Sequence, residues 1–203
     1  MNQRLIKKIR KNPDAVNWEV LCEDEILSEA FIEEFQDKVY WNIVSHYQTL
    51  SETFIARFQD KVSWYYISIY QELSGEFIER FSHLVEWDCI SYWQKLSESF
   101  MIKHSDELEW EGISESQTLS ENFIATFKDK VDWDAISENQ RLTEDFMSAF
   151  RDKINWRLIS ASQILSESFI AEFKYVVDWW YIKSRQQYSQ EFVQYFKTEL
   201  ESV

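Results

Sequence analysis

The chain has 203 residues, of which 45% are hydrophobic and 17% aromatic, so it is far too apolar to be disordered. Its 36 Asp and Glu residues against 21 Lys and Arg give a formal charge of −15, which repels phosphate backbones and anionic lipids, so we expect neither a nucleic-acid nor a membrane partner. Two glycines and one proline are too few for a sheet fold with many tight turns, and this favours helices.

Residues 1–15 are predicted to form an N-terminal capping helix. Leu5, Ile6 and Ile9 make an apolar stripe among five Lys and Arg residues, and Pro13 ends the helix. This basic start lacks the apolar core of a signal peptide, and no apolar run in the chain reaches the ~18 residues of a membrane span. We therefore expect a cytoplasmic protein.

Residues 16–187 are predicted to form an array of repeats. Tryptophan recurs at every 23rd residue from Trp18 to Trp179, and a phenylalanine and a glutamine keep the same spacing. The repeat reads L-S-E-x-F-I-x-x-F-x-D-K-V-D-W-x-x-I-S-x-x-Q-x, and seven complete copies run from Leu27 after a half copy in 16–26. Such a period indicates an α-solenoid. A leucine-rich repeat has a similar period, but its L-x-L strand and regular asparagine do not occur.

The repeat that begins at Leu119 predicts two helices. Apolar residues recur in steps of four from Leu119 onward, as on one helix face, and Ser120 is the expected N-cap. A second helix follows its own cap, Asp132, and carries the Trp and the Gln on one face. We expect helices of about 8 to 10 residues joined by turns of about 2 to 4. Other repeats place Asn17, Ser63, Asn155 or Asp178 at the second cap.

One repeat buries too little apolar surface to fold alone, so the repeats are expected to stack. We predict columns in which Phe packs on Phe and Trp on Trp at every step. Each repeated Gln amide is expected to bond backbone groups at helix ends, and the Ser three residues earlier, replaced by Lys183 in the last repeat, is equally regular. The Glu of the L-S-E motif and the Asp–Lys pairs are expected to interact with helix dipoles.

Residues 188–203 are predicted to form a C-terminal capping helix that keeps Phe192 and Phe196 but has no Trp. The repeat that begins at Leu96 departs most from the pattern, because His104 replaces a Phe, Glu107 replaces the Lys and Gly112 enters the second helix. A bend or a weak point is expected there. The three histidines are too far apart in the sequence for a metal site, and we expect no metal and no cofactor.

The cysteines, Cys22 and Cys89, are 67 residues apart and form neither a disulfide framework nor a zinc motif. Two reduced and partly buried thiols are the expectation, which agrees with a reducing compartment. No repeat holds a unique set of nucleophile, base and orienting group, so we expect no enzymatic activity.

In a repeat protein, binding specificity is expected at the variable positions, and these concentrate in the second helix. Early repeats have aromatic residues there, where middle repeats have Glu115, Ser116, Glu138 and Asn139. The candidate partner-binding residues are Tyr47, Tyr65, Tyr66, Tyr70, Tyr92 and Trp93. Tyr and Trp dominate interface energetics, which favours a protein-binding surface. The alternative is that these rings thicken the core between repeats or are scattered over the surface.

The run LSENFIATFKDKVDWDAISENQRLTEDFM resembles the tandem repeats of uncharacterised proteins of giant DNA viruses that infect amoebae, over about residues 16 to 200. The resemblance implies a viral protein that acts in the host cytoplasm through protein–protein contacts, and it implies no chemistry. Three hypotheses follow. The first is a protein-interaction scaffold, and the second is a self-associating structural component of a virion or assembly. The third, single-stranded RNA reading by one base per repeat, is disfavoured by the charge.

Overall fold

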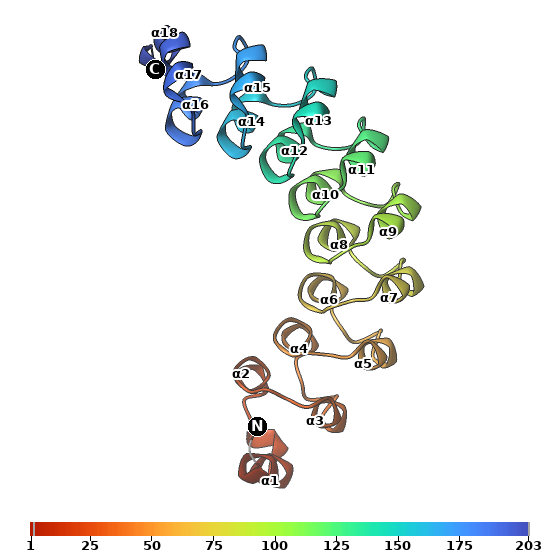
Figure 1. The fold of residues 1–203 in the computed structure, drawn as a ribbon. Helices are drawn as coiled ribbons and strands as arrows, with labels where there is room; N and C mark the ends of the chain where they lie inside the picture. Colours follow the sequence, from red (N-terminus) through yellow and green to blue (C-terminus); the bar gives the residue numbers. More distant parts are fainter. Residues whose placement is uncertain (2, 203) are drawn as a thin grey trace. The chain divides into compact units, whose positions relative to one another are not determined.

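The computed structural model describes residues 1 and 3–202, and short helices of two kinds alternate along it (Figure 1). No strand occurs among these residues, so the predicted all-α solenoid of two-helix repeats is confirmed. The Trp helices, each starting at a repeat Trp, are α2 (Trp18–Asp24), α4 (Trp41–Tyr47), α6 (Trp64–Tyr70), α8 (Trp87–Trp93), α10 (Trp110–Ser116), α12 (Trp133–Asn139), α14 (Trp156–Ser162) and α16 (Trp179–Arg185). The Phe helices are α3 (Glu29–Glu34), α5 (Glu52–Arg57), α7 (Gly75–Arg80), α9 (Glu98–Lys103), α11 (Glu121–Thr126), α13 (Glu144–Ala149), α15 (Glu167–Glu172) and α17 (Gln190–Tyr195). The chain starts with α1 (Gln3–Lys11) and the 3₁₀-helix η1 (Pro13–Ala15), and α18 (Lys197–Glu201) follows α17.

The chain divides into two compact units, Met1–Glu107 (unit 1, α1 to α9) and Leu108–Val203 (unit 2, α10 to α18). Within each unit the Trp helices of successive repeats pack side by side in one row, and the Phe helices form a second row (Figure 1). Fully buried Ile, Val or Met side chains from both rows, such as Ile55 of α5 and Ile67 of α6, make the core between them. The core thus repeats with the sequence.

The helices are shorter than predicted, with six residues in α3 to α17 of the Phe row and seven in the Trp row. In the second repeat, Phe58 has φ −108° and ψ 29°, which ends α5. A separate turn then closes by a hydrogen bond of 3.1 Å from the Val62 N–H to the Phe58 carbonyl oxygen. The four-residue apolar spacing therefore continues through a turn, which is why the pattern overestimated the helix length.

The N-caps are largely as predicted. In every Phe helix that follows α1, the cap hydroxyl accepts a backbone N–H; Ser120, for example, accepts from Phe123 at 3.2 Å. In the Trp row, Asn17, Asp132, Asn155 and Asp178 also cap their helices through the side chain. Ser63 occupies the N-cap position of α6, as predicted, but its side chain makes no capping bond. Its ψ of 106°, against 151° at Ser51, turns the short side chain away from the helix, whereas the longer Asn and Asp side chains still reach.

The aromatic columns pair differently from the prediction of Phe on Phe and Trp on Trp. Within each unit, the Trp ring of one repeat contacts the two Phe rings of the next, except that Trp87 contacts Phe100 and His104. Trp64 lies 6.2 Å from Phe77 and 5.2 Å from Phe81, centroid to centroid, and these two Phe rings lie 4.6 Å apart. The indole N–H of Trp64 also donates to the Gln59 carbonyl oxygen at 3.0 Å. Each Trp therefore closes the turn of its own repeat and stacks on the next repeat.

The repeated glutamines bond backbone groups at helix ends, as predicted, and each of the six described below bonds two carbonyl oxygens of the preceding repeat and the N–H of the leucine that begins its own repeat. Gln71 Nε2 donates to the carbonyl oxygens of Ser45 (3.0 Å) and Gln48 (2.8 Å), and its Oε1 accepts the Leu50 N–H (2.9 Å). Gln48, Gln94, Gln140, Gln163 and Gln186 make the equivalent bonds. The two carbonyl groups lie at the end of the preceding Trp helix and the leucine N–H lies in the loop after it. One buried amide side chain therefore provides hydrogen-bond partners for both.

The repeated serine has a similar role between neighbouring Trp helices. Ser137 is fully buried, its hydroxyl donates to the Trp133 carbonyl oxygen at 2.6 Å, and it accepts the Asn155 N–H of the next repeat at 2.9 Å. Cys22 occupies this position in the first Trp helix and accepts the backbone N–H of Tyr40. Lys183 occupies it in α16, where the side chain is exposed. The repeated serine thus links each Trp helix to the next one in the row through its hydroxyl group.

The glutamate of the L-S-E motif joins neighbouring Phe helices, which the sequence reasoning missed. Glu52 Oε1 accepts the backbone N–H of Ser74, the cap of the next Phe helix, at 2.6 Å. The same bond occurs at Glu29, Glu121, Glu144 and Glu167. Gly75 replaces this glutamate in the third repeat, and a cavity of about 660 Å³ opens there between α7 and α9, lined in part by Gly75 and Ser97.

Gly75→Glu is expected to raise the free energy of unfolding by about 1 kcal/mol, because it removes a helical glycine and supplies a carboxylate for the Ser97 N–H. A Cβ at Gly75 would lie 3.1 Å from Phe100 Cδ2, so that ring must shift by a few tenths of an ångström. Urea denaturation measures the change. Gly75→Ala is the matched control, since it adds the Cβ without the carboxylate. If the two variants are equally stable, the proposed bond does not form.

The Asp–Lys pairs form ion pairs between repeats, as at Lys61 and Asp37 (3.2 Å) and at Lys153 and Asp129 (3.1 Å). They lie in the turns after the Phe helices, as expected. The Asp37 side chain is 87% exposed, so we assign these pairs little stabilisation. The main polar links between repeats are therefore the buried Gln and Ser.

Candidate protein-interaction surface

The last residue of each Trp helix is the variable position with the clearest aromatic pattern. In unit 1 it is Tyr47 in α4, Tyr70 in α6 and Trp93 in α8, which we call the aromatic row. These side chains are 50%, 53% and 65% exposed. In unit 2 the position holds Ser116, Asn139, Ser162 and Arg185. Three consecutive repeats of unit 1 thus present a large exposed ring at the same place.

A second group of rings lies beside the aromatic row. The His46 ring stacks on Tyr66 at 4.9 Å, nearly parallel at 2°, and lies 4.2 Å from the ring of Tyr70 and 4.0 Å from that of Tyr47. Tyr65 meets Tyr66 edge to face at 5.3 Å. Four of the predicted residues, Tyr47, Tyr65, Tyr66 and Tyr70, therefore form one cluster with His46. The sequence reasoning missed His46 as a member, although it directly precedes Tyr47.

The other two predicted residues belong to α8. Trp93 lines a cavity of about 410 Å³ together with Tyr70, Ile69 and Leu73, so the structure brings Tyr70 and Trp93 to one hollow. Tyr92 is half-buried in the same helix. The alternative of a thickened core applies to Tyr66 and Tyr92, which are half-buried, and does not apply to the exposed aromatic row.

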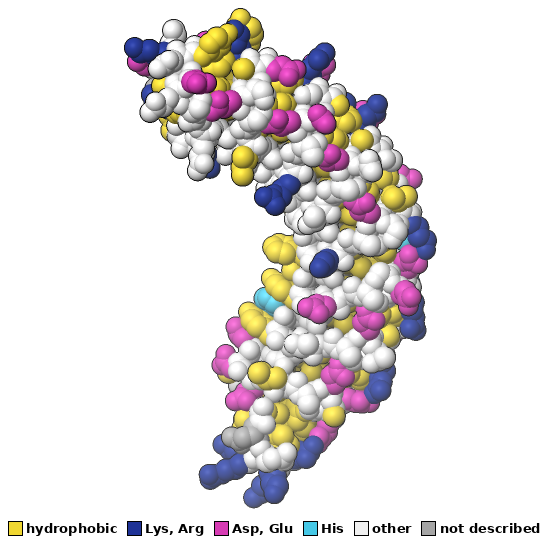
Figure 2. Space-filling view, in the orientation of Figure 1, with side chains coloured by type: hydrophobic (Ala, Val, Ile, Leu, Met, Phe, Trp, Pro, Cys, Tyr) yellow, Lys and Arg dark blue, Asp and Glu magenta, His cyan; other side chains and the backbone are white. Residues whose placement is uncertain are grey.

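Charge is unevenly distributed around this surface. The Trp helices of unit 1 contain no Lys or Arg, and their acidic residues are Glu19, Glu23, Asp24 and Asp88. Figure 2 shows the hydrophobic side chains and a histidine over α4 to α8 on the left-hand edge of unit 1, with most of the dark blue side chains on the opposite edge or at α1. The nearby charge of Glu23, to which the Tyr47 hydroxyl donates, raises the pKa of Tyr47. The surface therefore combines exposed aromatic rings with nearby carboxylate groups.

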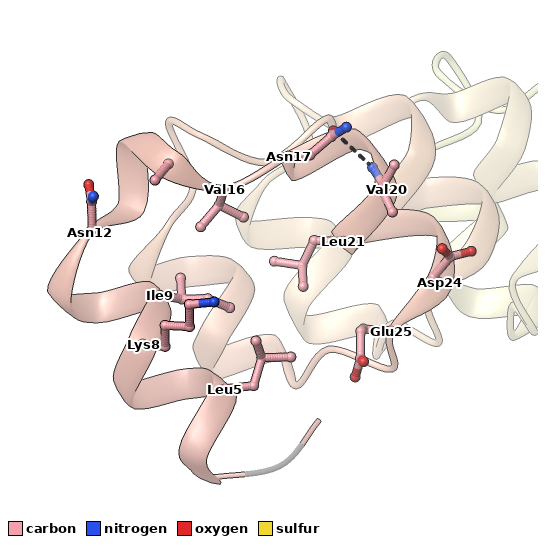
Figure 3. A pocket seen from close by; sticks show the side chains of 11 residues that line it. Leu5, Lys8, Ile9, Asn12, Val16, Asn17, Val20, Leu21, Asp24 and Glu25 are labelled. Atoms are coloured by element: carbon pink, nitrogen blue, oxygen red, sulfur yellow. Dashed lines mark hydrogen bonds between the residues drawn. The ribbon is translucent and has the colours of Figure 1, made fainter.

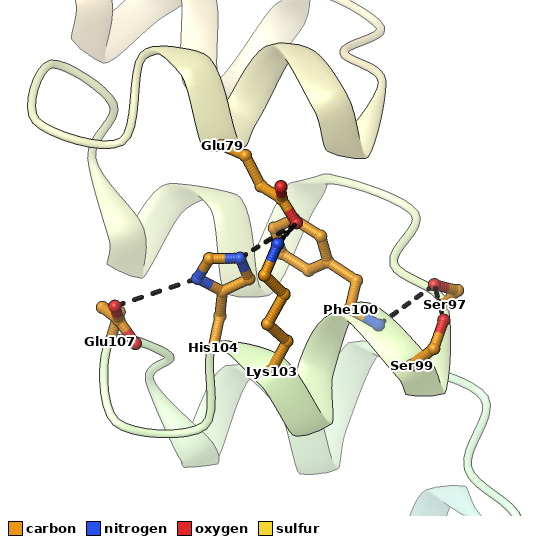
Figure 4. A network of polar contacts seen from close by, with 7 residues as sticks. All are labelled: Glu79, Ser97, Ser99, Phe100, Lys103, His104 and Glu107. Carbon is orange, nitrogen blue, oxygen red and sulfur yellow. Dashed lines mark hydrogen bonds and ion pairs between the residues drawn. The ribbon is translucent and has the colours of Figure 1, made fainter.

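The repeat with His104 replaces an apolar contact by a polar one (Figure 4). The His104 ring stacks on Trp87 at 5.3 Å, and its Nε2 lies 3.2 Å from Glu79 Oε1, which also pairs with Lys103 Nζ at 2.7 Å. The Lys103 contact, with a smaller contribution from His104, lowers the pKa of Glu79. His104 Nδ1 is buried without a hydrogen bond among the described residues, 3.8 Å from Glu107 Oε1. This buried nitrogen is a structural reason for the weak point expected in this repeat, and the weakness itself stays a prediction.

His104→Phe is expected to raise the free energy of unfolding by about 1 kcal/mol, because it restores the ring pair and removes a buried nitrogen without a partner. Glu79 keeps its contact with Lys103 in this variant. Urea denaturation followed by circular dichroism measures the effect. The reverse change at an ordinary repeat, Phe81→His, is expected to lower stability; if both changes are neutral, the second Phe position contributes little to the junction.

The segment 4–26 has the length of one repeat and keeps its Ile9, Asp14, Val16 and Trp18 positions. The Trp18 indole N–H donates to the Pro13 carbonyl oxygen at 2.9 Å, and Lys38 pairs with Asp14, as in later repeats. Lys8 and Asn12 stand where the next repeat has its two Phe residues. An apolar groove of about 410 Å³ lies between α1 and α2, and Figure 3 shows Leu5, Ile9, Val16 and Leu21 around it. The segment thus shares bonds of the repeat fold, but Lys8 and Asn12 replace its two Phe rings.

The cysteines offer no activated nucleophile. Both are free and buried, and burial followed by the nearby Asp88 charge raises the pKa of the Cys89 thiol to about 11. Burial also raises the pKa of Cys22. Both side chains are therefore protonated thiols at neutral pH.

Neither a metal site nor a membrane segment is found where the structure is described. Residues 1 and 3–202 include no group of three or more His, Cys, Asp and Glu side chains placed to hold a metal, and no helix among them has the length and apolarity to span a bilayer. Comparisons with known proteins add no functional assignment. No family model, no curated protein and no solved structure matches this chain.

Proposed function

We propose that the chain is a non-catalytic scaffold that binds a partner protein through the variable positions of its Trp helices in unit 1. The observation that carries this proposal is the aromatic row, in which three consecutive repeats expose a large ring at one position. Exposed Tyr and Trp side chains grouped on a rigid framework are typical of binding hot spots. The buried Gln and Ser bonds hold the Trp helices in register and so fix the spacing of the rings.

The absence of enzymatic activity is part of the proposal. The polar residues that recur in every repeat are engaged in backbone bonds, and the thiols are protonated. A reducing, cytoplasmic location agrees with two buried free cysteines, and the resemblance to viral repeats would make it the cytoplasm of an infected host cell.

The test compares the proteins that immobilised chains retain from host lysate. The wild-type chain is compared with the double variant Tyr70→Ala/Trp93→Ala and with Tyr195→Ala, a control that removes an exposed ring from unit 2. We expect a partner that the double variant loses and the control keeps. Retention of the same proteins by all three chains would contradict the assignment of the surface.

Self-association is a second candidate, and the groove between α1 and α2 favours it. Its apolar lining includes Val20, which is 47% exposed, and the groove lies beside the basic helix α1 of an otherwise acidic chain. Light scattering across a concentration series tests this function. We expect a mass that rises with concentration in the wild type and stays monomeric in Val20→Asp; a monomer at every concentration in the wild type would exclude it.

A further inference from the structure

We propose that the aromatic row binds a proline-rich segment of the partner in the polyproline II conformation, and that this segment carries Lys or Arg. The inference rests on the proposed scaffold function and names the chemical class of its partner. Three properties of the surface support it, namely the spacing of the rings, the hollow between two of them and the charge around them.

The spacing of the row suits a polyproline II helix. Tyr47, Tyr70 and Trp93 end the successive helices α4, α6 and α8, which pack side by side. Packed helices lie about 8–10 Å apart, and a polyproline II helix advances about 9.3 Å in each turn of three residues. Every third residue of such a segment therefore meets a ring. A β-strand presents alternate side chains about 6.7 Å apart, and an α-helix rises about 5.4 Å per turn, so neither matches ring after ring.

The hollow between Tyr70 and Trp93 provides a place for a proline ring. Its volume is about 410 Å³, and its lining includes the side chains of Ile69 and Leu73. Aromatic-lined grooves of this kind bind polyproline II segments, which lose little conformational entropy on binding. The free carbonyl groups of such a segment need donors, and the hydroxyl of Tyr70 is one. The equivalent place in unit 2 also has a hollow, of about 400 Å³, but Ser162 and Arg185 stand there in place of Tyr70 and Trp93, so it has no aromatic wall.

The charge of the surface selects a cationic segment. The Trp helices of unit 1 contain no Lys or Arg. Glu23 and Asp24 lie in the last turn of α2, at the same helix end as the rings, and Glu72 lines the hollow, whereas Glu19 and Asp88 lie in the first turns of their helices. Lys95, on the loop after α8, also lines it, so a ligand cation is expected toward the α2 and α4 end of the row, where Glu23 and Asp24 lie. Opposite charge raises the association rate, and Arg also stacks on exposed aromatic faces.

The experiment measures binding of labelled synthetic peptides to the full chain by fluorescence anisotropy at physiological salt. The probe is a peptide of Pro-Pro-Arg triplets; Gly-Gly-Arg and Pro-Pro-Glu peptides of equal length separate conformation from charge. We expect the Pro-Pro-Arg peptide to bind at least about tenfold more tightly than either control. Trp93→Ala should weaken it about tenfold, while Tyr195→Ala should not. Circular dichroism verifies that both variants are folded.

The outcomes separate this inference from the scaffold function. Equal binding of the Pro-Pro-Arg and Gly-Gly-Arg peptides, or binding that ignores Trp93→Ala, overturns the inference, because charge alone would then explain it. No binding of any peptide, together with a lysate partner that the Tyr70→Ala/Trp93→Ala chain loses, also overturns it and leaves the scaffold function standing. If neither peptides nor lysate proteins depend on these residues, both proposals fall.

Discussion

Gln71→Leu is expected to lower the free energy of unfolding by roughly 4 kcal/mol. The leucine fills a similar volume but leaves the carbonyl oxygens of Ser45 and Gln48 and the N–H of Leu50 without partners. Each buried polar group that loses its bond costs about 1–3 kcal/mol, and the Gln71 side chain is only 5% exposed, so water has little access. Urea denaturation measures the change, and hydrogen exchange at the Leu50 amide locates it.

The matched control is Gln59→Leu, since Gln59 is an exposed glutamine in the same repeat as Gln71. Its side chain is expected to contribute within about 0.5 kcal/mol. Equal effects of the two substitutions would mean that the buried amide has no special role. An unchanged exchange rate at Leu50 in the Gln71 variant would have the same meaning.

Trp156→Ala is expected to cost about 3 kcal/mol, because it removes a ring that lies 4.7 Å from Phe173 and 6.0 Å from Phe169 and an indole bond of 3.0 Å to the Arg151 carbonyl oxygen. Trp156→Phe should lose less, since it keeps most of the ring contact. Thermal and urea denaturation measure both. Trp180→Ala is the control, because Trp180 is exposed in the next Trp helix of the same unit. A loss in Trp180→Ala as large as in Trp156→Ala would contradict the stacking argument.

Much of this architecture follows from patterns that act within a few residues. The cap at Ser120 and the helix that begins after Asp132 were predictable, because a capping side chain bonds a backbone N–H three residues later. The role of the glutamines was predictable for a different reason. A polar residue that recurs with the same period as the core residues is expected to be buried with them and to need hydrogen-bond partners. The backbone groups at helix ends are the ones left without partners inside the helix.

Features that depend on how one repeat meets the next were not predictable in the same way. A period of 23 residues is equally compatible with Trp on Trp and with Trp on Phe, since both pairings recur at every step. The structure selects the second, as at Trp64 and Phe81. The bond from the Ser74 N–H to Glu52 was missed because a glutamate in the first turn already has a sufficient explanation in the helix dipole. For the candidate surface, chemistry identified Tyr47, Tyr70 and Trp93, but only the fold distinguishes exposed rings from half-buried ones.

The polar links that hold the array together join residues separated by 18, 21, 22, 23, 24 or 26 positions, and within each unit this set recurs from one repeat to the next. A whole extra copy of the repeat would reproduce every one of these separations, whereas an insertion of a few residues would break several at once. The array can therefore gain or lose whole repeats of 23 residues and keep these bonds. A copy of one of the three repeats that carry Tyr47, Tyr70 or Trp93 would lengthen the aromatic row by one ring, whereas a copy of a unit 2 repeat would not.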